Sequence, residues 1–196
     1  MKKILFVVMM GLFATALLWA DDYSGWDVIR PLLLDGEGSE FVRPITGLQA
    51  DEFTGASEFE AVQAAANWVS ENYSYVLDEG EVWTSSDQMY ARLTGDCEDW
   101  AILLCSLLRF HTDGGIPAKR VWVAINLVQE PGVGVYAAHA WVGYRLERGG
   151  MAHIEPANGV FYRGQPKGML EFNDQTVKGG GQFLAGKPRG SGEGKK

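Results

Sequence analysis

The feature that most constrains this chain is a helix predicted from Cys97 to His111. Its apolar residues cover most of the helix circumference, so the helix must be buried on nearly all sides. They are Trp100, Ala101, Leu103, Leu104, Leu107 and Leu108. Gly114 and Gly115 mark the end of the helix. Because such a helix is not stable on a protein surface, the rest of the chain must supply layers that cover it.

Another helix is predicted before the buried helix, and strands are predicted after it. Ser57 and Glu60 form a capping box, and apolar residues then recur at helical spacing up to Tyr73. A shorter helical stretch is predicted at 87–93. Three segments with strand patterns follow the buried helix: 119–128, 138–146 and 151–155. Helices first and antiparallel strands afterwards predict an α+β fold, with the central helix packed on the sheet.

The two ends of the chain differ in composition from its middle. Residues 1–20 combine Lys2 and Lys3 with a long apolar run, which is the layout of a secretory signal peptide. Cleavage after Ala16 or after Ala20 fits the pattern, and an uncleaved anchor is the alternative, because the run is near the lower length limit for a membrane span. The remainder divides into an irregular N-terminal segment (21–56), one folded domain (57–178) and a disordered tail (179–196). We expect an exported protein with no stable membrane insertion after signal cleavage.

The charge of the chain limits its partners. Without residues 1–20 the chain has 15 Lys and Arg residues against 25 Asp and Glu residues, a net charge of −10. Nucleic acids and anionic lipids repel a protein of this charge, because they are polyanions themselves. We therefore expect no nucleic-acid partner and no peripheral membrane role.

Both cysteines of the chain fall within the predicted buried helix. Cys97 and Cys105 are eight residues apart, which is about 12 Å of helical rise and exceeds the ~7 Å limit for a disulfide. They should therefore be free thiols. A free thiol kept in the oxidising compartment of an exported protein needs a reason, and catalysis is one.

Cys97 has the better position for chemistry. Thr94 and Asp96 are helix-start signals, so Cys97 falls in the first turn of the helix. The exposed amides and the positive end of the helix dipole favour a thiolate there, and the Cys97 N–H can bind a developing oxyanion. Cys105 lies two turns deeper and is explained as a small buried apolar residue.

A catalytic cysteine needs a base, and the chain has three histidines. His111 lies at the far end of the Cys97 helix, roughly 20 Å away by helical rise, and is excluded. His139 begins a strand directly after a loop. His153 lies in the middle of the next strand and shares a face with Glu155. Spacing alone does not choose between His139 and His153.

Three blocks of sequence resemble the core of the transglutaminase-like superfamily over residues 57–158. They are GDCEDWAILLCSLLRFHTDGGIPAKRVWVAI, HAWVGY and HIEPANG, in that order. The Gly95 to Asp99 form is most similar to the bacterial transglutaminase-like cysteine proteinases, which are exported enzymes and include periplasmic proteases that cleave surface adhesins. The resemblance implies that residues 57–178 form a transglutaminase-like domain with a papain-like α+β core.

The resemblance also implies roles for three residues. Cys97 is the nucleophile, and His139 is the general base that later protonates the leaving group. Glu155 falls at the position of the orienting acid, where the family usually has Asp; the longer carboxylate can still accept a hydrogen bond from the imidazole. His153 then becomes a flanking surface residue of its strand.

An acidic run surrounds the nucleophile and has two interpretations. Asp96, Glu98 and Asp99 place three carboxylates within four residues, and the proteinases that this chain resembles use such a run as a supporting Ca²⁺ site. Alternatively, acids in a first helical turn simply complement the helix dipole, a stabilisation of about 0.3–1 kcal/mol each. The proposed chemistry needs no other cofactor.

These observations predict a periplasmic or secreted bacterial cysteine hydrolase, a peptidase or amidase. Its substrate would be a protein or peptide, cleaved at a peptide or isopeptide bond through a thioester on Cys97. The alternatives are acyl transfer to an amine and a non-catalytic binding module on the same fold. Trp83 and Gln88 precede the nucleophile and could line the cleft or donate to the oxyanion, although a tryptophan here is more often a core residue.

Overall fold

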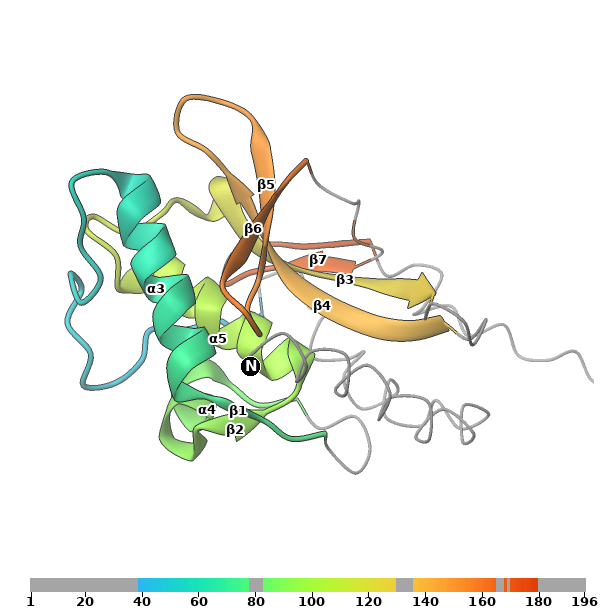
Figure 1. Ribbon diagram of the computed structural model, residues 1–196. Coiled ribbons are helices and arrows are strands. Elements are labelled where there is room, and N and C mark those ends of the chain that lie inside the picture. Colours follow the sequence, from blue (N-terminus) through green and yellow to red (C-terminus); the bar gives the residue numbers. More distant parts are fainter. Residues whose placement is uncertain (1–38, 78–82, 130–135, 165–167, 169, 180–196) are drawn as a thin grey trace, which may run out of the picture.

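Helix α5 (Cys97–Phe110) occupies the centre of the molecule. The computed structural model describes residues 39–77, 83–129, 136–164, 168 and 170–179 (Figure 1). Every residue from Glu98 to Leu108 is buried, as the apolar circumference of the helix predicts. Helices α3 and α4 and strands β3 and β4 pack around α5. The prediction of a buried central helix is therefore confirmed.

The other two α-helices within the described residues begin at capped N-termini. In α3 (Glu58–Asn72), the Ser57 hydroxyl accepts a hydrogen bond from the Glu60 N–H at 3.3 Å, as predicted. Helix α4 (Ser86–Arg92) begins with a capping box of Ser85 and Gln88. It ends at Leu93, which has a left-handed φ of 58°.

A short two-stranded parallel sheet leads into α5. It pairs β1 (Ser74–Tyr75), which follows α3, with β2 (Thr94–Gly95), which is separated from Cys97 only by Asp96. Gly95 is required there, because a Cβ atom would lie 2.6 Å from Asp99 Oδ2 and 2.9 Å from Met89 Sδ. The close packing of Gly95 fixes where α5 begins.

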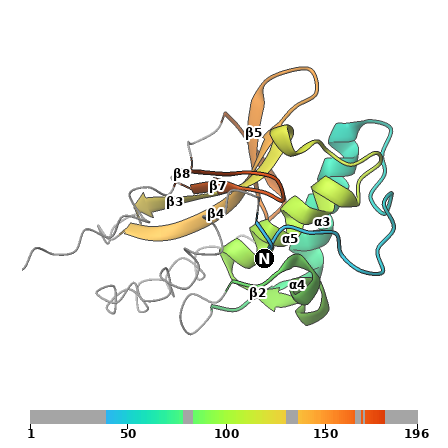
Figure 2. The same cartoon turned by 180° about the vertical axis from the view of Figure 1, so that it is seen from behind.

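In the part of the chain that the structure describes, the main sheet has six antiparallel strands in the order β6-β5-β4-β3-β7-β8. The strands are β3 (Val121–Gln129), β4 (Tyr136–Arg145), β5 (Met151–Glu155), β6 (Val160–Arg163), β7 (Leu170–Phe172) and β8 (Val177–Gly179). Along β4, Ala140, Val142 and Tyr144 alternate into the core that α5 shares. The helices gather on one side of this sheet (Figures 1 and 2). The predicted α+β class, with a helix packed on an antiparallel sheet, is confirmed.

The strands differ from the prediction in detail. The strand expected at 119–128 begins at Val121, because Ala118–Arg120 forms a 3₁₀ turn. The strand expected at 138–146 runs from Tyr136 to Arg145. Strands β6, β7 and β8 were not predicted, since each has only three or four residues and no alternation long enough to recognise.

The described part of the N-terminal segment, residues 39–56, has no helix or strand, but it is packed into the core. Val42, Ile45 and Phe53 are buried. The predicted signal peptide at 1–20 and residues 180–196 of the predicted tail lie outside the described residues. Within the described ranges, no helix is both long and apolar enough to cross a membrane.

Candidate active site

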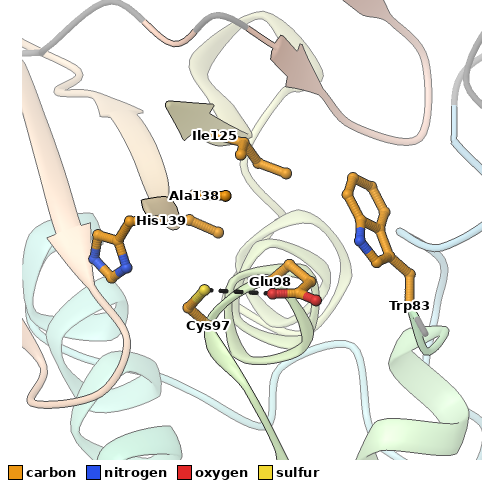
Figure 3. Close-up of a pocket in the computed structure, with 7 residues that line it drawn as sticks. Trp83, Cys97, Glu98, Ile125, Ala138 and His139 are labelled. Carbon is orange, nitrogen blue, oxygen red and sulfur yellow. Dashed lines mark hydrogen bonds between the residues drawn. The ribbon is translucent and has the colours of Figure 1, made fainter. Parts of the chain in front are cut away.

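Cys97 lies at the first position of α5 and borders a small depression between the helix and the sheet (Figure 3). The depression is lined by Trp83, Cys97, Glu98, Ile125 and residues 138–140. Its volume of about 10 Å³ is close to the space of a single water molecule. Cys97 is partly exposed at this depression, whereas Cys105 is fully buried, and both are free thiols as predicted.

His139 lines the same depression and is held by Glu155. The His139 Nε2 and Glu155 Oε2 atoms are 2.6 Å apart, joining neighbouring strands β4 and β5. An ionised Glu155 accepts the Nε2–H of the imidazole, which leaves the Nδ1 lone pair as the acceptor for a proton. The structure thus brings the three predicted catalytic residues together, and the longer side chain of Glu155 reaches the imidazole.

The other two histidines have partners elsewhere. His153 stacks on Tyr162 with ring centroids 4.7 Å apart and has Nδ1 3.4 Å from the Gly164 carbonyl oxygen. Glu155 therefore bonds to the histidine of the neighbouring strand and not to the one on its own strand. At the far end of α5, His111 Nε2 accepts from the Ile45 N–H and Nδ1 lies 2.8 Å from the Gln49 carbonyl oxygen.

The electrostatic environment of the thiol differs from the sequence-based expectation. The Cys97 thiol donates a hydrogen bond to Glu98 Oε2 at 3.3 Å. Burial raises the pKa of Cys97 well above its ordinary value, and the negative charges of Glu98 and Asp96 raise it further, against a lowering contribution from the Ala140 backbone. The prediction that the helix start lowers this pKa is wrong, because desolvation and two nearby carboxylates raise it.

The carboxylates of the acidic run are placed at the start of α5 and have contacts within the protein. Glu98 accepts from the thiol, Asp99 Oδ1 accepts from the Thr84 N–H at 2.8 Å, and Asp96 is the N-cap residue of α5. Among the described residues, no group of three or more His, Cys, Asp or Glu side chains is placed to hold a metal ion.

Trp83 and Gln88 have different positions relative to the site. Trp83 is 8% exposed, lines the depression and stacks on Phe172 at a centroid distance of 5.4 Å, so it belongs to both the cleft and the core. Gln88 is held in the cap of α4 by Ser85 and does not line the depression.

Two features of the site were not anticipated from the sequence. One is the bond between the thiol and Glu98, which adjacency in the sequence could have suggested. The other is Tyr75 in β1: burial first, and then the charges of Cys97, Asp96, Glu98 and Glu155, raise the pKa of its hydroxyl above its usual range. Tyr75 therefore lies in the electrostatic field of the site. A two-residue strand has no sequence pattern that would reveal this.

A cysteine at the start of a buried helix, beside a strand-borne His–Glu pair, defines the class of papain-like thiol hydrolases and acyltransferases. The family model for the transglutaminase-like superfamily matches residues 41–156. The chain therefore belongs to the transglutaminase-like superfamily, and the resemblance noted in its motifs is confirmed.

One structural match is a crystal structure of a candidate cysteine protease from Cytophaga hutchinsonii, with 18% sequence identity and a TM-score of 0.39. The match covers 68% of this chain and 38% of that protein, so this chain corresponds to well under half of its length. A search of curated protein sequences finds no match.

Proposed function

We propose that this protein is an exported cysteine peptidase or amidase that hydrolyses a peptide or isopeptide bond of a protein substrate. The observation that carries the proposal is the 2.6 Å contact between His139 Nε2 and Glu155 Oε2 beside the helix-borne Cys97. A non-catalytic binding module has no use for an oriented imidazole next to a thiol.

The geometry supports acyl transfer through a thioester. The Cys97 sulfur attacks the carbonyl carbon while His139 Nδ1 takes the thiol proton, and the Cys97 N–H at the helix start donates to the oxyanion. When the C–N bond breaks, His139 returns the proton to the leaving amine. His139 then deprotonates a water that attacks the thioester, which releases the acid and restores the thiol. Glu155 holds the tautomer and stabilises the imidazolium throughout.

The raised pKa of Cys97 makes proton transfer part of the reaction. The resting site holds a thiol bonded to Glu98, and not a preformed thiolate. As the substrate binds, the thiol must break its hydrogen bond to Glu98 and donate its proton to the His139 imidazole instead. The base is therefore needed in the acylation step, and reactivity should depend on His139 as well as on Cys97.

Alkylation by iodoacetamide near neutral pH, read by mass spectrometry, tests this proposal without a known substrate. Cys97 should be modified, Cys105 should stay unmodified because it is fully buried, and His139→Ala should slow the modification of Cys97. In a fluorogenic peptide-amide assay, Cys97→Ala should abolish amine release. A His139→Ala variant that is alkylated as fast as the parent protein would overturn the assignment.

The remaining elements of the proposal have separate tests. Adding a primary amine and analysing the products separates hydrolysis from transfer, since both pass through the same thioester. Export to the periplasm or the medium is tested by fractionating cells that express the full chain. That bound Ca²⁺ supports the activity remains a sequence-based prediction. A chelator that changes neither the activity nor the melting temperature would rule it out.

A further inference from the structure

A second and larger cavity lies away from Cys97, toward the other end of strands β3 and β4. Its volume is about 270 Å³. Its walls come from the 3₁₀ turn, from β3, β4 and β5, and from the β7–β8 hairpin. The lining residues are Ala118, Lys119, Trp122, Arg145, Met151, Glu171, Asn173, Gln175, Thr176 and Lys178. The proposed chemistry at Cys97 uses none of them.

The cavity is positively charged in an otherwise acidic protein. Lys119, Arg145 and Lys178 line it and are exposed, against a single acid, Glu171. The whole chain has a net charge of −8. Because like charges elsewhere on the surface repel an anionic ligand, this local excess of cations is where such a ligand would bind.

The wall of the cavity is held in place by buried contacts. Asn173 is 1% exposed and donates from Nδ2 to the carbonyl oxygens of Ala118 and Val121, at 2.7 and 2.9 Å. Its Oδ1 accepts from the N–H groups of Gln175 and Thr176. The 3₁₀ turn that carries Lys119 and the hairpin that leads to Lys178 are thus tied to one side chain. The backbone positions that carry Lys119 and Lys178 are therefore held relative to each other.

Two observations favour a polypeptide as the ligand. Lys178 lies on β8, the outermost described strand on this side of the sheet, and an edge strand can pair with an extended peptide (Figure 2). Arg145 lies on β4 six residues beyond His139 and on the same face, about 20 Å away at ~3.4 Å per residue. An extended peptide of about six residues spans that distance. The chain's own residues 180–196 do not suit the cavity, since they contain four basic residues and one acidic residue.

We propose that this cavity binds an acidic stretch of a polypeptide and, resting on the proposed function, that this stretch belongs to the substrate whose bond is cleaved at Cys97. The acidic side chains would pair with Lys119, Arg145 and Lys178 while the scissile bond lies at the other end of β4. The cavity then contributes to substrate selection without touching the reacting atoms.

Fluorescence polarisation with a labelled hexaglutamate peptide tests the binding. Lys119→Gln, Arg145→Gln and Lys178→Gln should each weaken binding about two- to fivefold, as expected for exposed charge pairs, and the triple variant should weaken it further. Arg163→Gln is the matched control, because it removes one exposed positive charge on β6 outside the cavity. Added salt should weaken the binding to the parent protein.

Several outcomes would overturn this proposal. The first is the absence of hexaglutamate binding, and the second is a loss of affinity in Arg163→Gln as large as that in the cavity variants. The third is displacement of the peptide by inorganic phosphate as effectively as by unlabelled hexaglutamate. The fourth is binding of a sulfated oligosaccharide in place of the peptide. The first two exclude a specific acidic site, the third indicates a small-anion site, and the fourth indicates another class of polymer.

Binding and hydrolysis can be tested separately, so a failure of the acidic-peptide site can be distinguished from a failure of the proposed enzyme. Hexaglutamate should bind the Cys97→Ala variant as it binds the parent protein. If that binding occurs but no peptide amide is hydrolysed, the proposed enzyme fails and the acidic-peptide site stands. If hydrolysis occurs, an acidic stretch about six residues from the scissile bond should raise kcat/KM, and the triple variant should remove the increase. Hydrolysis that is indifferent to the acidic stretch would overturn the assignment to the substrate.

Discussion

The two ends of helix α5 have opposite electrostatic arrangements. At the C-terminal end, Arg109 pairs with Asp174 through two contacts of 2.5 and 2.7 Å, and both nitrogens of His111 contact backbone groups. At the N-terminal end, the Cys97 thiol lies beside the buried carboxylates of Asp96 and Glu98, which raise its pKa. One end satisfies its charges with opposite partners, whereas the other gathers groups of the same sign.

This difference separates stability from reactivity along a single helix. At the C-terminal end, the Arg109–Asp174 ion pair joins α5 to the β7–β8 hairpin, and hydrogen bonds of His111 join it to the N-terminal segment. Like charges at the N-terminal end are unfavourable in a buried position and persist where the surrounding packing holds them. We therefore expect substitutions at the N-terminal end to change chemistry and those at the C-terminal end to change folding.

The largest expected effect is on catalysis. His139→Ala should lower the rate of peptide-amide hydrolysis by about a thousandfold or more, because it removes the base that the thiol requires. Circular dichroism should show an unchanged fold. His153→Ala is the control and should keep most of the activity, since His153 contacts Tyr162 and not Glu155. Loss of activity in His153→Ala with retention in His139→Ala would reverse the assignment.

The next effect is on stability, at the other end of the helix. Arg109→Leu should lower the free energy of unfolding by about 3 kcal/mol, because it leaves Asp174 without its partner in a largely buried position. Arg109 also donates to the Ile116 carbonyl oxygen. Urea unfolding measures the loss. Arg163→Leu, at an exposed position, should change stability little. An Arg109→Leu variant as stable as the parent would show that the C-terminal end of α5 does not have the proposed role in stability.

A smaller effect is expected from shortening the acid of the His–Glu pair. Glu155→Asp withdraws the carboxylate by about 1.5 Å, the length of one C–C bond. The 2.6 Å contact with His139 would be lost, and kcat should fall roughly tenfold to hundredfold. A rise in kcat in Glu155→Asp would contradict this expectation. Strands β4 and β5 would then have to shift to restore the contact with His139, and the contact would not depend on the longer side chain.

The smallest effect concerns the acid beside the thiol. Glu98→Gln removes a negative charge that raises the pKa of Cys97, so that pKa should fall. Below the pKa the thiolate fraction then rises, and the pH profile of iodoacetamide alkylation moves to lower pH. A fall of one unit would speed alkylation about tenfold at a given pH. Glu71→Gln, on the exposed side of α3, is the control. An unchanged profile would mean that Glu98 does not set the reactivity of the thiol.

The sequence alone was sufficient for the features that depend on local patterns. The apolar circumference of α5, the N-cap at Ser57 and the position of Cys97 in a first helical turn are properties of neighbouring residues. The order of helices and strands predicted the α+β class, and the motif blocks indicated the superfamily. Spacing did not decide between His139 and His153, and only the resemblance favoured His139.

Only the tertiary structure decided the features that depend on contacts between distant residues. Glu155 bonds to His139, sixteen positions away, and not to His153 two positions away. Burial and the turn of the Glu98 carboxylate toward the thiol reversed the expected direction of the Cys97 pKa shift. The cationic cavity joins a 3₁₀ turn, strands β3, β4 and β5, and a hairpin. Desolvation and charge proximity act through space, so a linear pattern of residues does not specify them.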